Sequence, residues 1–313
     1  MEWSSKFPKS TLLSALQSGA PLVPLITDSS SFCQMLGEGL ELSYQDEGAF
    51  GEIYGTIFKD IVMKRGKVKL RADQMECLLP SRNYGCSDET ISDACILAAL
   101  TTLGLENFPM FHGLFTCDNY IYIAMEKING KTYTKMQSQL DWETKGSILF
   151  QIIYALMMAQ DQFQLGHNDL IGGNIMLKSV PERTLTYEVG GKLFAVPNYG
   201  YCPVIIDFGK SRITLNKDIS IFNRNMLKYY AGHEVIPFSG SSDICKLLKN
   251  PTMVDWIKPK PQSKLFYTEG CKQLTGKCVY DDRRGDHPVI PPFPQYVARD
   301  VFETDLFDQY LQK

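Results

Sequence analysis

Two short motifs in the second half of the chain contain the residue types that phosphoryl transfer requires. His167, Asp169 and Asn174 form the pattern H-x-D-L-x-x-x-N directly after a predicted long helix. In this spacing the aspartate accepts a proton from the attacking hydroxyl and the asparagine binds magnesium. Further along, an apolar run ends in D-F-G at Asp207, whose carboxylate would hold Mg²⁺ on the phosphates.

A glycine turn and a strand lysine precede these motifs. The turn Gly48-Ala49-Phe50-Gly51 separates two predicted strands, and its glycines would let the backbone approach phosphate oxygens. Thirteen residues after Gly51, Lys64 lies in the run I-V-M-K, from which it could reach the α- and β-phosphates. Taken singly, a hairpin turn and a solvated surface lysine explain both features. Taken in order with the later motifs, they predict an ATP-dependent phosphotransferase with ATP and Mg²⁺ as cofactors.

The elements that must position these groups are also visible in the hydrophobic pattern. From about Leu40 the sequence predicts a β-meander with a short turn at Lys59 and Asp60. A helix is predicted over 87–103, where apolar residues recur at helical spacing after an N-cap serine. A β-rich run follows at 119–130, and a long buried helix is predicted over about 142–165, with Asp141 as its N-cap.

Composition narrows the possible classes of partner. The 313 residues carry a formal net charge of −3, with 21% charged and 44% hydrophobic residues. This balance predicts no direct nucleic-acid binding and leaves room for a basic protein substrate. No signal peptide is visible, and the most apolar stretch, 148–158, is far shorter than the roughly 20 residues that span a bilayer. We therefore expect a soluble intracellular protein, in the cytoplasm or nucleus, without a membrane partner; oligomeric state is not predicted.

The cysteines favour reduced thiols. There are nine, an odd number, scattered along the chain without a C-x-x-C pair. This distribution is not typical of a disulfide framework or of a closed zinc site.

The motifs together resemble those of the protein kinases and, within them, most closely the haspin type. Asp207 follows Asn174 by 33 residues, and the intervening segment contains an insert like that of haspin kinases. Within it, 184–189 and 192–196 read as two strands joined by Gly190-Gly191, a predicted β-hairpin. The runs G-N-I-M-L from Gly173 and S-D-I-C-K-L-L from Ser242 resemble further haspin motifs. The resemblance extends from about residue 40 to the C-terminus and is strongest over 166–248.

This resemblance implies an α+β fold of the bilobal protein-kinase type. Residues 1–128 would form a small β-rich N-lobe with one main helix and an N-terminal extension, and 129–313 a larger, mostly helical C-lobe. It implies a serine/threonine kinase acting on a protein, basic or histone-like by analogy with haspin. Met125 would be the gatekeeper, with backbone groups of Glu126 and Ile128 receiving adenine. His167 and Asp243 would brace the catalytic loop.

The acidic partner of Lys64 remains open between two residues of the predicted helix. Glu89 and Asp93 lie one turn apart on the same face. Spacing to the following apolar pair favours Asp93, whereas reach favours the longer Glu89, and each could instead stabilise the helix N-terminus. Glu89 is slightly preferred.

Two residues depart from the kinase pattern. Asn168 replaces the arginine of H-R-D, so phosphorylation of the activation loop is not expected to be the on-switch. Ile171 stands where many kinases have a lysine and haspins a histidine, which removes a donor to the γ-phosphate.

Two other functions compete with this interpretation. Small-molecule kinases of the aminoglycoside or choline type share the catalytic-loop pattern, and the missing lysine at Ile171 favours them. A catalytically silent pseudokinase scaffold is the other, although Lys64, Asp169, Asn174 and Asp207 are all present.

Overall fold

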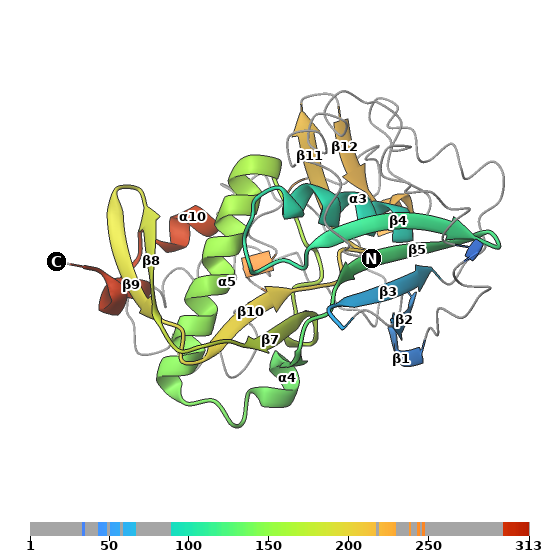
Figure 1. Ribbon diagram of the computed structural model, residues 1–313. Helices are drawn as coiled ribbons and strands as arrows, with labels where there is room; N and C mark the ends of the chain where they lie inside the picture. Colours follow the sequence, from blue (N-terminus) through green and yellow to red (C-terminus); the bar gives the residue numbers. More distant parts are fainter. Residues whose placement is uncertain are drawn as a thin grey trace. The chain divides into compact units, whose positions relative to one another are not determined.

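The structure is a computed structural model with mixed α-helices and β-sheets (Figure 1). It describes residues 33–34, 43–48, 51–56, 59–66, 89–216, 219–229, 238, 243–244, 246–247 and 297–312. Ala49 and Phe50 of the predicted glycine turn, and nearly all of the first forty residues, lie outside the described residues.

The chain divides into two compact units. The first comprises 1–128, 207–227 and 234–236, and the second comprises 129–206, 228–233 and 237–313. The segment 207–227, which the sequence division assigned to the C-lobe, therefore groups with the first unit. The reason is local, because β12 (Ile219–Phe222) packs against α3 (Glu89–Thr101) within that unit.

The first unit contains a five-stranded antiparallel sheet in the order β1-β2-β3-β5-β4. Its strands are β1 (Ser43–Gly48), β2 (Gly51–Gly55), β3 (Ile61–Gly66), β4 (Phe111–Cys117) and β5 (Tyr120–Glu126). Gly48 pairs with Gly51 at the end of the first hairpin. The β4–β5 hairpin turns through Asp118 and Asn119, which adopt φ of 50° and 64°, the left-handed geometry of tight hairpin turns. The predicted β-meander is confirmed.

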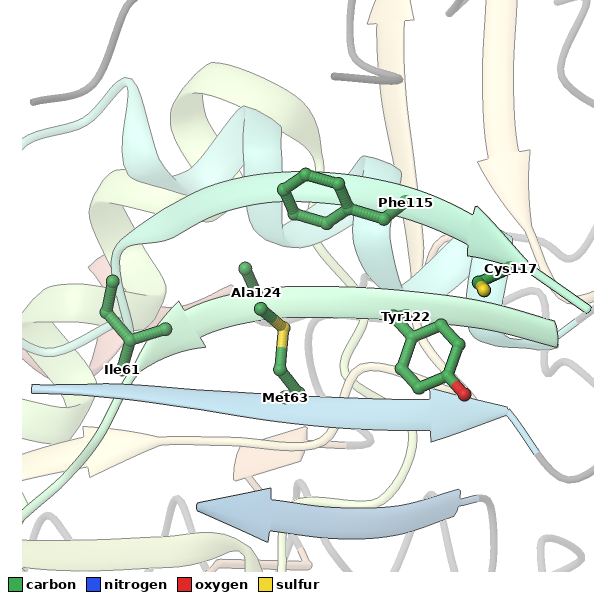
Figure 2. Close-up of a cluster of buried hydrophobic side chains, with 6 residues drawn as sticks. All are labelled: Ile61, Met63, Phe115, Cys117, Tyr122 and Ala124. Atoms are coloured by element: carbon green, nitrogen blue, oxygen red, sulfur yellow. The ribbon is translucent and has the colours of Figure 1, made fainter. Parts of the chain in front are cut away.

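Side chains alternate along β3, so its apolar residues and Lys64 lie on opposite faces of the sheet. Ile61 and Met63 point to one face of the sheet, where they pack with a cluster from β4 and β5 (Figure 2). That cluster also contains Phe115, Cys117, Tyr122 and Ala124. Because successive strand residues point to opposite faces, Lys64 faces the other side, where α3 packs on β3, β4 and β5.

One disulfide corrects the thiol prediction. Cys33 is bonded to Cys117 at the end of β4, at a sequence separation of 84, whereas Cys95 and Cys202 are free and buried. The expectation of reduced thiols was thus wrong for Cys33 and Cys117. The two cysteines pair because the fold brings distant parts of the chain together, and their spacing in the sequence does not indicate this.

The helix α3 is almost fully buried. Eleven of its residues, Thr90 to Leu100, are buried, and its last turn is followed by Gly104 with φ of 67°. The prediction placed this helix at 87–103, so its existence is confirmed, and its predicted C-terminal end lies two residues beyond the observed one. Next to it lies the hairpin of β11 (Arg212–Asn216) and β12.

The second unit is organised around α5 (Trp142–Phe163). The predicted cap is confirmed, because Asp141 Oδ1 accepts the backbone N–H of Thr144 at 2.8 Å. The helix ends at Phe163, and its C-cap residue, Gln164, adopts φ of 47°. One side packs on β10 (Tyr201–Ile205), which belongs to a sheet ordered β10-β7-β6 with β7 (Ile175–Ser179) and β6 (Gly130–Thr132). The short helix α4 (Tyr133–Met136) follows β6.

The predicted insert hairpin is confirmed. It consists of β8 (Thr184–Val189) and β9 (Lys192–Pro197), joined by Gly190 and Gly191 with φ of 58° and 76°. Glycine adopts two such angles at the least steric cost. Figure 1 shows this hairpin beside α5 with α10 (Ala298–Val301). Phe150 of α5 is the centre of an aromatic cluster with Tyr187, Phe194, Phe302, Phe307 and Tyr310, the last two from η6 (Asp305–Tyr310).

Among the described residues, no helix is both long enough and apolar enough to cross a bilayer.

Candidate active site

Lys64 lies at the centre of a buried charge cluster in the first unit. Its Nζ is 2.6 Å from Asp93 Oδ2 and 3.0 Å from Asp207 Oδ1. The lysine is only 7% exposed. Burial disfavours its charge, but the two carboxylates outweigh that effect and raise the pKa of Lys64 above its ordinary value. The ammonium is therefore charged at neutral pH and holds the D-F-G aspartate.

The preferred pairing of Lys64 with Glu89 was wrong, because Asp93 is the partner. The shorter side chain suffices since α3 packs directly on β3. Asp93 also accepts the backbone N–H of Phe208 through Oδ1, at 3.1 Å. One carboxylate thus links the strand lysine to the D-F-G segment, which helical periodicity alone could not show.

Glu89 lies one turn earlier, against the same segment. A Cβ on Gly209 would lie 3.1 Å from Glu89 Cγ, so the two residues are in close contact. Burial, and then the charge of Asp207, raise the pKa of Glu89 to about 7. Its side chain also receives a hydrogen bond from Asn223, a residue that sequence reasoning missed because no motif marks it.

The catalytic-loop residues lie together in the second unit. Asn174 Nδ2 donates to the backbone carbonyl of Asp169 at 2.9 Å and approaches Asp169 Oδ2 at 3.5 Å. The loop is closed by backbone hydrogen bonds from Ile171 N to Asp169 O and from Asn174 N to Ile171 O, each 2.9 Å. The short 3-10 helix η3 (Gly172–Asn174) results. With its amide nitrogen toward Asp169, Asn174 directs its oxygen away from that carboxylate.

His167 and Asp243 hold the backbone of this loop through hydrogen bonds, as predicted. The fully buried Asp243 accepts the backbone N–H groups of His167 and Asn168 at 2.6 and 2.7 Å. His167 Nε2 is 3.1 Å from the carbonyl oxygen of Ile206, the residue before the D-F-G triplet. Asn168 adopts φ of 63°, and Lys246 donates to its carbonyl. These contacts fix a left-handed backbone turn next to Asp169.

Replacing Asp243 with asparagine is expected to lower the free energy of unfolding by about 2 kcal/mol. An amide supplies one acceptor oxygen instead of two, so one buried N–H of the loop loses its partner. Chemical denaturation measures the change. Asp308→Asn, at an exposed aspartate of the second unit, is the control, and an equal loss in both variants would contradict the assignment.

The predicted adenine contacts lie at the end of β5 or two residues beyond it. Met125 and Glu126 end β5, opposite Val62 and Ile61 of β3. The N–H of Glu126 donates to Met110 O at 2.9 Å, so an adenine contact through its backbone would use the carbonyl. Ile128 is the last residue of the first segment of that unit. Within the described ranges, no group of three or more His, Cys, Asp or Glu residues is arranged to hold a metal ion.

The sequence matches the family described as "Haspin like kinase domain" over residues 97–280, more than half of the chain. The chain belongs to the haspin-like kinase family. Asp169, Asn174 and Asp207 lie inside the matched range, and Lys64 and Asp93 lie before it.

Several named proteins are similar to the chain. The chain is 33% identical over 138 residues to "Probable kinase 098L" of Invertebrate iridescent virus 3, covering 42% of this chain and 26% of that protein. It is 32% identical over 202 residues to the serine/threonine-protein kinase haspin of Bos taurus, and the match covers 53% of this chain and 26% of that protein. The chain is also 32% identical over 101 residues to haspin of Mus musculus, and the match covers 32% of this chain and 13% of that protein. The chain thus spans about a quarter of these relatives or less.

Proposed function

We propose that the chain is an ATP- and Mg²⁺-dependent protein serine/threonine kinase with the bilobal kinase fold. The observation that carries this proposal is the position of Lys64, in contact with both Asp93 and Asp207. Kinases transfer phosphate only when the strand lysine is paired with the helix acid and the D-F-G aspartate is in place. Family membership supports the same reaction class.

The roles of the remaining residues follow from the chemistry. Asp169 would accept the proton of the attacking hydroxyl, and the Asn174 contact holds the backbone of Asp169 in place. Asn174 and Asp207 would hold the metal, since amide and carboxylate oxygens are the ligands Mg²⁺ prefers, and Asn174 turns its nitrogen, not its oxygen, toward Asp169. When bound, Mg²⁺ supplies neutralisation of the phosphate charge.

The nucleotide would occupy the first lobe, residues 1–128. Its phosphates would lie under the turn Gly48-Ala49-Phe50-Gly51 and near Lys64, and adenine beside Met125, Glu126 and Ile128. Residues 129–313 would form the second lobe and receive the protein substrate. Glu89 has no part in this assignment, because Asp93 takes the role expected of it.

The proposed substrate is a basic or histone-like protein. Two mammalian relatives are named as haspin serine/threonine kinases, and the chain's own net charge of −3 suits a basic partner. A small-molecule kinase is the alternative. It is favoured by Ile171, which is 49% exposed beside Asp169 and provides no cation for the γ-phosphate.

The test is transfer of labelled γ-phosphate from Mg-ATP to histones, a generic basic protein and an aminoglycoside panel. We expect label on serine or threonine of the basic proteins, and none with Asp207→Ala. Label only on the small molecules would establish the alternative. ATP binding without transfer to any acceptor would indicate a pseudokinase scaffold.

A further inference from the structure

The backbone directly after the D-F-G triplet is held by a contact that the Lys64 cluster does not include. Gly209 packs against the side chain of Glu89, the first residue of α3. A Cβ at Gly209 would lie 3.1 Å from Glu89 Cγ, closer than most real Cβ contacts, and 3.4 Å from Glu89 Oε1, an ordinary van der Waals distance. Glycine at this position therefore allows the helix and the D-F-G segment to approach each other.

Asn223 forms hydrogen bonds with both residues of this contact. It follows β12 and is 1% exposed. Its Nδ2 donates to the carbonyl of Gly209 at 3.0 Å, and its side chain also hydrogen-bonds the carboxylate of Glu89. Its Oδ1 accepts the N–H of Asn225 at 2.9 Å. A side-chain amide has two N–H donors and one carbonyl, so a single buried residue can serve all three partners.

The helix α3 thus holds the D-F-G segment at two successive levels. Asp93 binds the N–H of Phe208, and Glu89, one turn earlier, contacts Gly209 directly and through Asn223. Because Asn223 ends the β11–β12 hairpin, the second level also ties that hairpin to the triplet. Asp207 adopts φ of 66°, in the left-handed region that residues other than glycine occupy uncommonly.

We propose that Glu89 and Asn223 are positioning residues that hold Asp207 in its metal-binding conformation through Gly209. They act on the backbone of the triplet and touch neither nucleotide nor acceptor. The proposal rests on the proposed function in one respect, namely that Asp207 is a metal ligand. The two residues form what we call the Glu89–Asn223 contact.

Metal dependence of transfer tests the proposal in the active enzyme. Residues that orient a metal ligand typically alter metal affinity by about 10-fold to 100-fold when removed. We expect Glu89→Ala and Asn223→Ala each to raise the half-saturating Mg²⁺ concentration about 10-fold, with a smaller fall in kcat. Glu89→Gln keeps the acceptor for Asn223 and should stay within about 2-fold of the native chain. The double alanine variant should lose less than the sum of the two single effects, because both single variants remove the hydrogen bond between Glu89 and Asn223.

Hydrogen exchange of the backbone over 207–223 tests the same contact without any activity. Glu89→Ala and Asn223→Ala should exchange about 5-fold to 10-fold faster there, whereas Glu106→Ala, at an exposed glutamate of the same unit, should match the native chain. Unchanged exchange, a defect in Glu89→Gln equal to that in Glu89→Ala, or fully additive effects would each overturn the proposal. Faster exchange in a chain that transfers no phosphate would support the contact while refuting the kinase assignment.

Discussion

Replacing Asp169 with asparagine is expected to lower the rate of γ-phosphate transfer by about 10³-fold while leaving ATP affinity unchanged. The amide cannot accept the proton of the attacking hydroxyl, and general-base catalysis typically contributes about 10²-fold to 10⁴-fold. The loop should keep its shape, because Asn174 Nδ2 and Ile171 N both bond to the backbone carbonyl of residue 169, which the substitution leaves in place. Single-turnover transfer and nucleotide titration measure the two quantities separately.

Asp118→Asn is the matched control for this substitution. Asp118 is exposed in the β4–β5 turn at φ of 50°, a region that asparagine adopts readily, so transfer should be unchanged. A rate within a few-fold of native for Asp169→Asn would show that another group takes the proton. Loss of ATP affinity in the same variant would instead indicate a role in binding.

The parts that sequence predicted well are those set by local rules. The insert hairpin was placed to within one residue, because Gly190-Gly191 between alternating strands permits little else. The cap at Asp141 and the loop contacts of Asp243 follow from hydrogen-bonding needs of particular backbone groups. The family was likewise correctly inferred from motif order.

The parts that it missed depend on how distant segments meet. Glu89 and Asp93 lie on the same helical face, so only the distance between α3 and β3 decides which reaches Lys64. The Cys33–Cys117 bond joins segments 84 residues apart. Asn223 follows a hairpin that packs against α3, and no local sequence pattern predicts that packing. The gatekeeper and adenine assignments at Met125, Glu126 and Ile128 remain predictions.

The contrast between the two acids of α3 gives a second large expected effect, on stability. Asp93→Ala should lower the free energy of unfolding by about 3 kcal/mol, and Glu89→Ala by distinctly less. Removing Asp93 leaves the buried Lys64 with Asp207 as its ion-pair partner and removes the hydrogen bond from the Phe208 N–H to the Asp93 carboxylate. Breaking a buried pair from one side typically costs about 3 to 5 kcal/mol, and the Asp207 contact keeps the value at the lower end.

Urea denaturation of the metal-free chain measures both changes, and a second substitution identifies their cause. If the cost arises from an uncompensated buried ammonium, Lys64→Met in the Asp93→Ala background should recover part of the lost stability, since the neutral side chain keeps its packing and loses its charge. Lys59→Met, at an exposed lysine in the turn before β3, should recover none. A larger loss for Glu89→Ala than for Asp93→Ala would reverse the assignment of the helix partner. The contacts of Lys64 with Asp93 and Asp207 would then no longer support the proposal that this chain transfers phosphate.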